Sequence, residues 1–395
     1  MNIVIAGKNN IAIDVLEAMK FKYPSFQYYA VFNANDYGVD GFQRSFKKYC
    51  SESSIKELTL TEAYCLSNAI FISLEYDKIV NPKSFSHNRV YNIHFSKLPS
   101  YKGMYTSAWP IINGESQSGV TFHYIDKGID TGDIIYQECI AIQKGETAKS
   151  LYEKYIVSGT KLIVEHIDEI VAGKLTGKKQ DAYDSSYYSR KSIDYSDIDI
   201  DLKQTAFEIS NKINAFTFRD YQLPEIGGCK VFGCEILGSK SLNSAGTVVD
   251  GELYFIISTV DYDLKVYKDV FDDLLLSCRE GDLIRTKSLV NQFNVNEKDE
   301  NGWSPIIVAA YNGQLDIVEY LVSMGADIND SNYKGTTVFM YAKDFALKNN
   351  DSNFLEKLVG MGANPELTDL SGLNVFDYVE KTSDAASISF MRKFL

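Results

Sequence analysis

The chain has 395 residues and a net charge of −13, with 53 Asp and Glu against 40 Lys and Arg. This acidic balance argues against a nucleic-acid partner, because binding phosphates usually requires a basic face. No apolar stretch reaches the roughly 18 residues of a membrane span, and the six cysteines are scattered without metal-like spacing, so we expect a cytoplasmic protein without membrane insertion or a metal site.

Strand-like and helix-like segments alternate in the first part of the chain. The apolar run NIVIAG ends in a glycine and is followed by the helix-like AIDVLEAMKFKY. Further predicted elements are strands at 28–32, 69–74 and 89–95 and a helix around 61–66. The alternation continues to about residue 175 and predicts a doubly wound α/β domain, in which ligands bind at the carboxyl ends of the strands. The first turn lacks G-x-G-x-x-G, so a dinucleotide cofactor is not indicated.

Three polar residues near these strand ends could carry chemistry. Asn92 and His94 alternate along the strand predicted at 89–95, so they project from the same face. A carboxamide beside an imidazole supplies a fixed donor and a proton acceptor near neutral pH. Asp130 lies in a Gly-Ile-Asp-Thr-Gly loop, where a carboxylate could orient the histidine and stabilise its charged form. Each residue alone is more often structural, so the prediction rests on their combination.

The remainder of the chain divides in two. A helix-like run at 201–216 and glycine-punctuated strands up to 267 predict a small, mostly β domain. Beyond this point Gly302 recurs after 33 residues as Gly335, and Met324-Gly325-Ala326-Asp327 is echoed by Met361-Gly362-Ala363-Asn364. This period resembles ankyrin repeats, which stack into a solenoid. We expect domains at 1–200, 201–270 and 271–395, the last an all-α ankyrin tail.

The motif set resembles the formyltransferase family that uses N10-formyltetrahydrofolate. The family hallmark is N-x-H, then S-L-L-P-x-x-x-G, then an aspartate in a D-T-G or D-A-G loop. Here these are Asn92 and His94, the run 96–103, and Asp130, with Lys97 where leucine is commoner. The resemblance covers roughly residues 1–265 and implies a Rossmann-like formyltransferase domain with the mostly β domain behind it.

The resemblance also implies roles for individual residues. His94 is expected to be the base or proton shuttle, Asn92 to hydrogen-bond the oxyanion formed at the formyl carbon, and Asp130 to support His94. The co-substrate is N10-formyltetrahydrofolate, and no metal is needed. Its pterin should lie against 129–134 and the strand end at 73–78. The expected co-substrate contacts are Ser73, Leu74, Tyr76, Lys78, Ile129 and Asp133.

Three features address which amine is formylated. An acidic chain with ankyrin repeats does not fit the tRNA branch, and the glycinamide-ribotide enzymes end after the catalytic domain. The stretches YYSRKSIDYSDIDID and INAFTFRDYQ resemble segments of sugar-nucleotide formyltransferases, although Asn214 replaces the usual arginine and Asp220 stands near the usual proline. The expected acceptor contacts are Tyr105, Tyr187, Arg190, Phe216 and Tyr221, by analogy with base stacking and pyrophosphate binding in that branch.

The resemblance points most closely to dTDP-3-amino-3,6-dideoxyglucose N-formyltransferases, which serve O-antigen and lipopolysaccharide synthesis. The alternatives are a dTDP-4-amino-4,6-dideoxyglucose or UDP-4-amino-arabinose formyltransferase, and a formyltetrahydrofolate hydrolase. A homodimer is expected from the enzyme class. Ankyrin repeats commonly bind proteins, but Trp303 stands at a turn position expected to be exposed, with Tyr333 at the next turn. This pair raises the hypothesis of a second, regulatory site for the nucleotide sugar.

Overall fold

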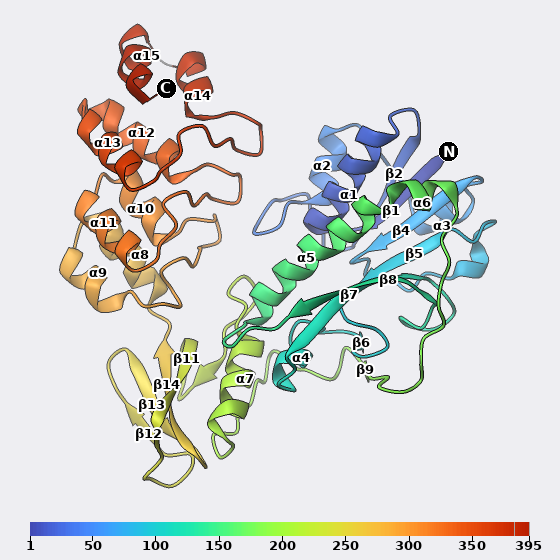
Figure 1. The fold of residues 1–395 in the computed structure, drawn as a ribbon, viewed down its shortest axis with the longest axis horizontal. Coiled ribbons are helices and arrows are strands. Elements are labelled where there is room, and N and C mark those ends of the chain that lie inside the picture. Colours follow the sequence, from blue (N-terminus) through green and yellow to red (C-terminus); the bar gives the residue numbers. More distant parts are fainter. Residues whose placement is uncertain (383, 395) are drawn as a thin grey trace. The chain divides into compact units, whose positions relative to one another are not determined.

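The computed structural model describes residues 1–382 and 384–394 and separates into two compact units, Met1–Val266 and Tyr267–Leu395 (Figure 1). The change in sequence character after Tyr267 falls at this division. The expected boundary at residue 200 lies inside the first unit and stays a prediction. Within the described ranges, no helix is both long and apolar enough to cross a membrane.

A seven-stranded sheet forms the centre of the first unit. Its strand order is β3-β2-β1-β4-β5-β7-β8. The strands are β1 Asn2–Gly7, β2 Gln27–Phe32, β3 Lys56–Glu57, β4 Ala69–Leu74, β5 Val90–His94, β7 Gln117–Tyr124 and β8 Ile134–Ala141. The first five pair in parallel, whereas β7 and β8 add an antiparallel edge beside β5. The sequence predicted the parallel strands β1, β2, β4 and β5, but neither the short β3 nor this antiparallel edge.

Two apolar cores cover the two faces of the sheet. Along β1, Ile3 and Ile5 belong to one core, and Val4 and Ala6 belong to the other. This is the period-two alternation of a strand that is buried on both faces. The first core holds the helices α1 Asn9–Lys22, α2 Phe46–Glu52 and α5 Ala148–Glu165, and the second holds α3 Leu60–Tyr64. These layers leave the carboxyl ends of the parallel strands to build a site.

Short elements complete this part of the chain. They are η1 Pro82–Ser84, β6 Lys102–Gly103, α4 Trp109–Ile112, α6 Ile167–Ala172 and β9 Tyr187–Tyr188. Strand β9 pairs in parallel with β6, so the chain around Tyr187 returns to the loop that follows β5. Helix α5 begins at a capping box in which Thr147 and Ser150 satisfy each other's backbone N–H groups.

Helix α7 (Ala206–Phe216) connects the main sheet to a second, five-stranded sheet. That sheet has the order β10-β11-β14-β13-β12, formed by β10 Glu225–Ile226, β11 Cys229–Lys240, β12 Val248–Asp250, β13 Tyr254–Ser258 and β14 Tyr262–Lys268. Ile209 and Ile213 pack in the core of this small sheet, whereas Ala215 and Phe216 belong to the main core. The helix therefore ties both sheets together within one unit.

The second unit is helical. Its helices are α8 Phe271–Glu280, α9 Leu283–Leu289, α10 Pro305–Tyr311, α11 Leu315–Ser323, α12 Val338–Asn349, α13 Ser352–Gly360, α14 Val375–Thr382 and α15 Ala385–Met391, followed by η2 Arg392–Phe394. The turns repeat, because Gly302, Gly335 and Gly372 have φ values of 81°, 81° and 73°. The Asn296 side chain donates to Gly325 O at 2.9 Å, and Asn329 donates to Gly362 O at 3.0 Å. This repeated geometry is that of stacked ankyrin units.

Candidate active site

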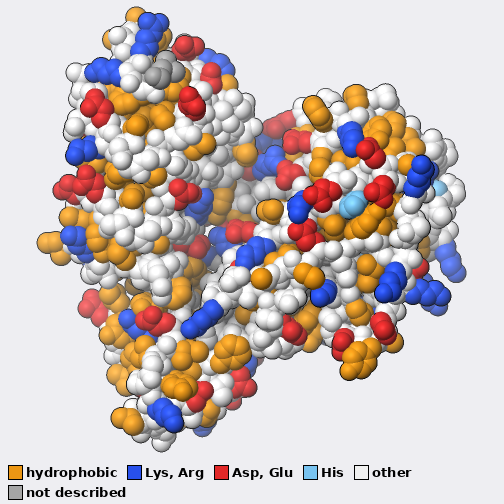
Figure 2. Space-filling view, in the orientation of Figure 1, with side chains coloured by type: hydrophobic (Ala, Val, Ile, Leu, Met, Phe, Trp, Pro, Cys, Tyr) orange, Lys and Arg blue, Asp and Glu red, His pale blue; other side chains and the backbone are white. Residues whose placement is uncertain are grey.

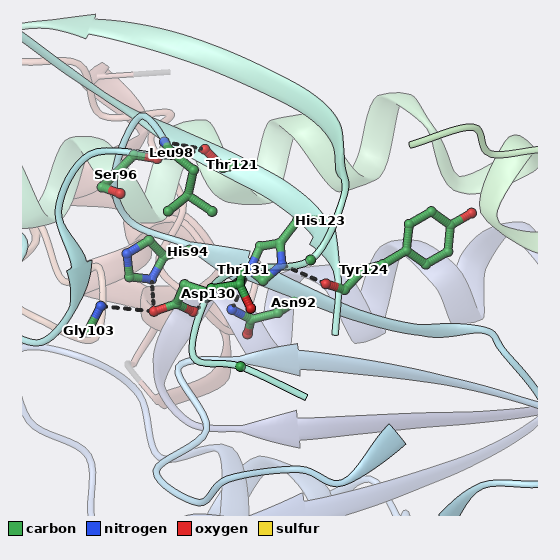
Figure 3. Close-up of polar contacts among 12 residues, drawn as sticks. Asn92, His94, Ser96, Leu98, Gly103, Thr121, His123, Tyr124, Asp130 and Thr131 are labelled. Carbon is green, nitrogen blue, oxygen red and sulfur yellow. Dashed lines mark hydrogen bonds and ion pairs between the residues drawn. The ribbon is translucent and has the colours of Figure 1, made fainter. Parts of the chain in front are cut away.

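Strands β5 and β7 bring the polar residues together. Asn92 and His94 lie on β5, where their antiparallel partners on β7 are His123 and Thr121. The loop between β7 and β8 carries Asp130 back to the same place, so that its carboxylate lies beside His94 and His123 (Figure 3). The three residues that the sequence singled out therefore meet at one point, at the carboxyl end of a parallel strand.

His94 is buried, and both ring nitrogens have neighbours. Its Nε2 lies 2.8 Å from the carbonyl oxygen of Tyr101, and its Nδ1 lies 3.4 Å from Asp130 Oδ2. A carbonyl oxygen can only accept, so Nε2 carries the hydrogen and the basic lone pair of the neutral ring is on Nδ1. A proton that arrives at Nδ1 is then stabilised by the adjacent carboxylate.

Asp130 is held in place by its own backbone and by two other segments. Its φ of 55° lies in the left-handed region, which aspartate tolerates better than most residues. The backbone N–H of Gly103 donates to Oδ2 at 2.9 Å, and Gln180 Nε2 donates to the Asp130 carbonyl at 2.8 Å. The carboxylate is thus fixed before any ligand arrives, which is the preorganisation that electrostatic stabilisation requires.

The loop after β5 is also rigid. The hydroxyl of Thr121 donates to the Ser96 carbonyl at 2.7 Å, and the backbone N–H of Leu98 donates to the same hydroxyl at 3.2 Å. The hydroxyl of Ser96 donates to the Ser100 carbonyl at 2.7 Å. These bonds place the next carbonyl, that of Tyr101, against His94. The Ser96–Gly103 motif therefore sets the tautomer of the base.

His123 is a site residue that the sequence analysis missed. Its Nδ1 lies 2.7 Å from the Tyr124 carbonyl, so this nitrogen carries the hydrogen and Nε2 accepts from Asn92 Nδ2 at 3.1 Å. That bond orients the carboxamide and leaves the second N–H of Nδ2 available to the site. Burial lowers the pKa of His123 to about 4, against the opposing effect of Asp130, so the ring is neutral near pH 7.

The depressed pKa of His123 predicts an acid sensitivity. Between its ordinary pKa of 6.5 and the folded value of about 4, the unfolded chain binds a proton that the folded chain does not. The free energy of unfolding should therefore fall as the pH drops through this window, by at most about 1.4 kcal/mol per pH unit. The free energy of unfolding, measured by urea titration at several pH values, should depend less on pH in His123→Gln than in wild type. The same pH dependence in both proteins would contradict the depressed pKa of His123. His166→Gln is the control at a surface histidine.

The expected co-substrate residues lie in different settings. Ser73 and Leu74 are buried within β4, whereas Lys78 and Ile129 are exposed. The Tyr76 hydroxyl is buried without a hydrogen-bond partner in the described part of the chain, and burial raises its pKa to about 12. Asp133 is partly buried, and its carbonyl accepts from Tyr124 N at 3.0 Å.

A cavity of 390 Å³ lies next to the catalytic strands, but other residues line it. These are Pro82, Lys83, His87, Asn88, Val90, Tyr124 and Ile125. Val90 precedes Asn92 on β5, and Tyr124 follows His123 on β7. His87 Nδ1 accepts from Arg89 N at 3.3 Å, so Nε2 carries the hydrogen, and it has no partner among the described residues. Sequence patterns missed this lining because it comes from a loop.

The expected acceptor contacts are only partly grouped. Tyr221 is 58% exposed, and its ring rests against Phe42 and Phe218 at centroid distances of 5.5 and 4.6 Å. Tyr187 and Arg190 are exposed. The Tyr105 hydroxyl donates to the Arg190 carbonyl at 2.9 Å, which places Tyr105 beside the chain that follows β9.

Phe216 was expected to contact the nucleotide, and that role stays a prediction. It is 8% exposed and lies in the main core, at the end of α7. Its ring meets Tyr195 edge-on at 6.1 Å. The end of the helix turns toward the main core, so little of the Phe216 surface is left for a ligand.

Trp303 was expected at an exposed turn, and it is instead partly buried. Its ring contacts Tyr341 at 4.7 Å and Tyr311 at 5.3 Å. Tyr333 lies close to the turn glycine, because a Cβ built on Gly302 would come within 2.8 Å of the Tyr333 ring. An aromatic cluster of Trp303, Tyr311 and Tyr341 therefore replaces the expected pair of exposed rings.

Comparison with known proteins agrees with this geometry. A family model for formyl transferases matches residues 36–167, which contain the three catalytic candidates, and a model for ankyrin repeats matches residues 274–369. The methionyl-tRNA formyltransferase of Clostridium beijerinckii is 33% identical over 164 residues. That match covers 40% of this chain and 51% of the relative, so the chain spans about half the length of this curated relative.

Two solved structures match almost over their full length. An N-formyltransferase from Helicobacter canadensis, in complex with folinic acid and dTDP-3-aminofucose, is 41% identical, with a TM-score of 0.64, and the match covers 67% of this chain and 98% of that one. WlaRD, a sugar 3N-formyltransferase crystallised with dTDP and 5-N-formyl-tetrahydrofolate, is 40% identical, with a TM-score of 0.65, over 68% and 98% of the two chains. The expected fold class is confirmed, and the chain belongs to the formyltransferase family, with ankyrin repeats in its second unit.

Proposed function

We propose that the protein transfers a formyl group from N10-formyltetrahydrofolate to the primary amine of a dTDP-linked amino sugar. The observation that carries this proposal is the assembly of Asn92, His94 and Asp130 at one strand end. It is supported by the similarity to two sugar N-formyltransferases that were crystallised with folates and dTDP ligands. The acidic charge of the chain argues against the tRNA substrate of the curated relatives.

The chemistry follows from the hydrogen bonds. The amine nitrogen attacks the formyl carbon, and the developing oxyanion accepts a hydrogen bond from Asn92 Nδ2, whose other N–H is bound to His123. One such donor is typically worth about 3 kcal/mol in the transition state. His94 Nδ1 takes the proton that the amine loses, and Asp130 stabilises the imidazolium. The bond from the formyl carbon to N10 then breaks, and the proton passes to N10.

The 390 Å³ cavity beside β5 is our candidate for the flat heterocycle of the co-substrate. Its apolar lining includes Val90 and Ile125, and His87 and Asn88 add polar side chains to it. Ligand pockets combine such an apolar lining with a few placed polar groups. The loop 129–134 and the strand end at 73–78 remain the predicted backbone contacts of the co-substrate.

For the acceptor we propose dTDP-3-amino-3,6-dideoxyglucose, in keeping with the 3-amino sugar and the 3N designation of the two similar proteins. Its thymine would stack on the exposed ring of Tyr221. The role in O-antigen and lipopolysaccharide synthesis, the homodimer and the cytoplasmic location stay predictions from the family resemblance.

A panel assay tests the proposed reaction. Purified protein is mixed with N10-formyltetrahydrofolate and with dTDP- or UDP-linked 3-amino and 4-amino sugars, and the products are read by mass spectrometry. The proposal predicts the mass of one added formyl group on a dTDP-3-amino sugar. If only a 4-amino sugar or a UDP-linked sugar were formylated, that sugar would be the acceptor in place of the proposed one. Formate release with no modified sugar would make the protein a hydrolase.

We further propose that the ankyrin unit binds a second copy of the nucleotide sugar at Trp303, now supported by the rings of Tyr311 and Tyr341. Tyr311 is 43% exposed, so the cluster has an open aromatic surface on which a base can stack. Calorimetry with the nucleotide sugar should show two binding events in wild type and one in Trp303→Ala. The control Tyr320→Ala should keep both. If Trp303→Ala also keeps both events, the cluster is a packing feature, and binding of a protein partner becomes the leading alternative.

A further inference from the structure

A second polar cluster lies at the carboxyl ends of β1 and β4, outside the catalytic residues described above. Asn9 Nδ2 donates to Glu75 Oε2 at 3.1 Å and to the Tyr152 hydroxyl at 2.7 Å. The Tyr152 hydroxyl donates in turn to Glu75, at 2.9 Å to Oε2. Asn9 is the first residue of helix α1, which follows β1; Glu75 directly follows the neighbouring strand β4, and Tyr152 lies on helix α5. We call them the Glu75 cluster.

The carboxylate of Glu75 is bound by neutral groups alone. In the part of the chain that the structure describes, it accepts from an amide and a phenol and forms no ion pair. A carboxylate has about four lone-pair positions, so these two donors leave capacity for more. Burial raises the pKa of Glu75, with Lys8 acting in the opposite direction. Partly buried carboxylates with unfilled acceptor sites are costly unless a ligand supplies donors.

The backbone has an unusual conformation at both Asn9 and Glu75. Asn9 has a φ of 66° and Glu75 a φ of 59°, both in the left-handed region. A positive φ is uncommon for glutamate and persists where the surroundings impose it, often at ligand sites. The preceding Gly7 permits the arrangement, because a Cβ on it would lie 1.7 Å from the Leu74 carbonyl oxygen.

The Glu75 cluster lies beside the catalytic strand. Strand β4 pairs in parallel with β5, with Leu74 opposite Ile93, so Glu75 leaves the sheet one strand from His94. Neighbouring strands are about 4.8 Å apart. The Tyr152 ring meets Phe95, the residue after His94, at 5.9 Å.

Tyr152 also connects the cluster to the aromatic surface around Tyr221. Its ring lies 6.2 Å from Phe42 and 5.7 Å from Phe218, the two rings that support Tyr221. Contacts between aromatic rings therefore connect the Glu75 cluster to the exposed ring of Tyr221.

We propose that Glu75, positioned by Asn9 and Tyr152, selects the acceptor by accepting a hydrogen bond from an O–H or N–H group of the amino sugar. This inference rests on the proposed function and assigns the sugar subsite of the same reaction. The recognised chemistry is a hydrogen-bond donor on the hexose ring, and not the nucleotide.

Calorimetry separates the sugar contribution from the nucleotide contribution. Wild type and Glu75→Gln are titrated with dTDP-3-amino-3,6-dideoxyglucose and with dTDP alone, without the co-substrate. The variant keeps the side-chain volume but replaces one acceptor oxygen by an NH2 donor. We expect the affinity for the amino sugar to fall about 10- to 100-fold, the usual range for a hydrogen bond to a charged group. The affinity for dTDP should be unchanged, and the exposed Glu57→Gln should match wild type for both ligands.

Further arms keep the test decisive. A dTDP-hexose with a hydrogen in place of the amine shows whether the donor is the amine or a ring hydroxyl, since the affinity loss caused by Glu75→Gln should vanish with this ligand only if the amine is the donor. Should Glu75→Gln not fold, Tyr152→Phe removes one donor to the carboxylate and should still change the affinity for the sugar but not for dTDP. Equal affinities for the amino sugar in wild type and variants would overturn the assignment. Failure of wild type to formylate any sugar would instead refute the proposed function, and the binding comparison would still decide the role of Glu75.

Discussion

Replacing His94 by glutamine should lower kcat for formyl transfer by about 10²- to 10⁴-fold, the usual contribution of a positioned general base. Glutamine can still donate to the Tyr101 carbonyl that now binds His94 Nε2 at 2.8 Å. It offers no basic nitrogen at the position of Nδ1, so the proton of the attacking amine has no acceptor beside Asp130. KM for both substrates should change little, because the ring contributes to the transition state more than to binding.

The same substitution at another histidine serves as the control. His166 lies on the surface of the first unit, stacked on Tyr136 at 3.7 Å and 3.2 Å from Glu169. His166→Gln should keep the wild-type rate. Steady-state rates with saturating co-substrate and acceptor measure the effect. A His94→Gln enzyme that retains more than about a tenth of the wild-type kcat would exclude His94 as the base.

Replacing Asp130 by asparagine should cost about 10⁴-fold in kcat, comparable with the exchange of the carboxylate that supports a catalytic histidine elsewhere. The carboxamide keeps the shape of the side chain, and its oxygen can still accept from Gly103 N, now at 2.9 Å. The negative charge 3.4 Å from His94 Nδ1 is lost, so the imidazolium that forms during transfer is no longer stabilised.

For Asp130→Asn, a loss of folding stability must be distinguished from a loss of catalytic rate. The hydrogen bond from Gly103 weakens when its acceptor becomes neutral, which should cost about 1 kcal/mol of folding free energy. Melting curves establish a temperature at which the variant is fully folded, and rates are compared there. Asp168→Asn, which breaks an exposed ion pair with Lys22, is the matched control. An Asp130→Asn enzyme with normal kcat would mean that the carboxylate only holds the loop.

The sequence singled out Asn92, His94 and Asp130 because each of them is marked locally. Asn92 and His94 share a strand face by simple alternation, and Asp130 sits in a glycine-bounded turn. His123 was missed because its contact with Asn92 depends on antiparallel pairing between β5 and β7. The period of either strand carries no information about its partner or register. The Glu75 cluster escaped notice for a similar reason, since its members lie up to 143 positions apart.

The settings of Phe216 and Trp303 differ from the expected ones for physical reasons. Helix α7 is apolar on more than one side because it packs against two cores, so its pattern did not show that Phe216 faces the main core. Trp303 occupies a turn that is exposed in an isolated repeat. Its neighbours Tyr311 and Tyr341 come from α10, which follows it, and from α12 of the next repeat, and they bury part of the ring. In stacked repeats, burial depends on the neighbouring repeat as much as on the position within the repeat.

The surface is consistent with a small acidic substrate bound at a defined site. In the face shown in Figure 2, Lys and Arg side chains are interspersed with Asp and Glu and do not gather into one broad basic area. Long polyanions require such an area, whereas one nucleotide sugar needs only a few positioned donors. This contrast separates the proposed acceptor from the tRNA substrate named for the methionyl-tRNA formyltransferases.

The most direct test follows the formyl carbon itself. N10-formyltetrahydrofolate labelled in its formyl carbon is mixed with excess wild-type protein and dTDP-3-amino-3,6-dideoxyglucose, and a single turnover is quenched and analysed by NMR. We predict that the label appears in the formamide of the sugar, and that His94→Gln and Asp130→Asn leave it on the folate. Label recovered as free formate, or remaining on the folate with the wild-type protein, would contradict formyl transfer to the sugar amine.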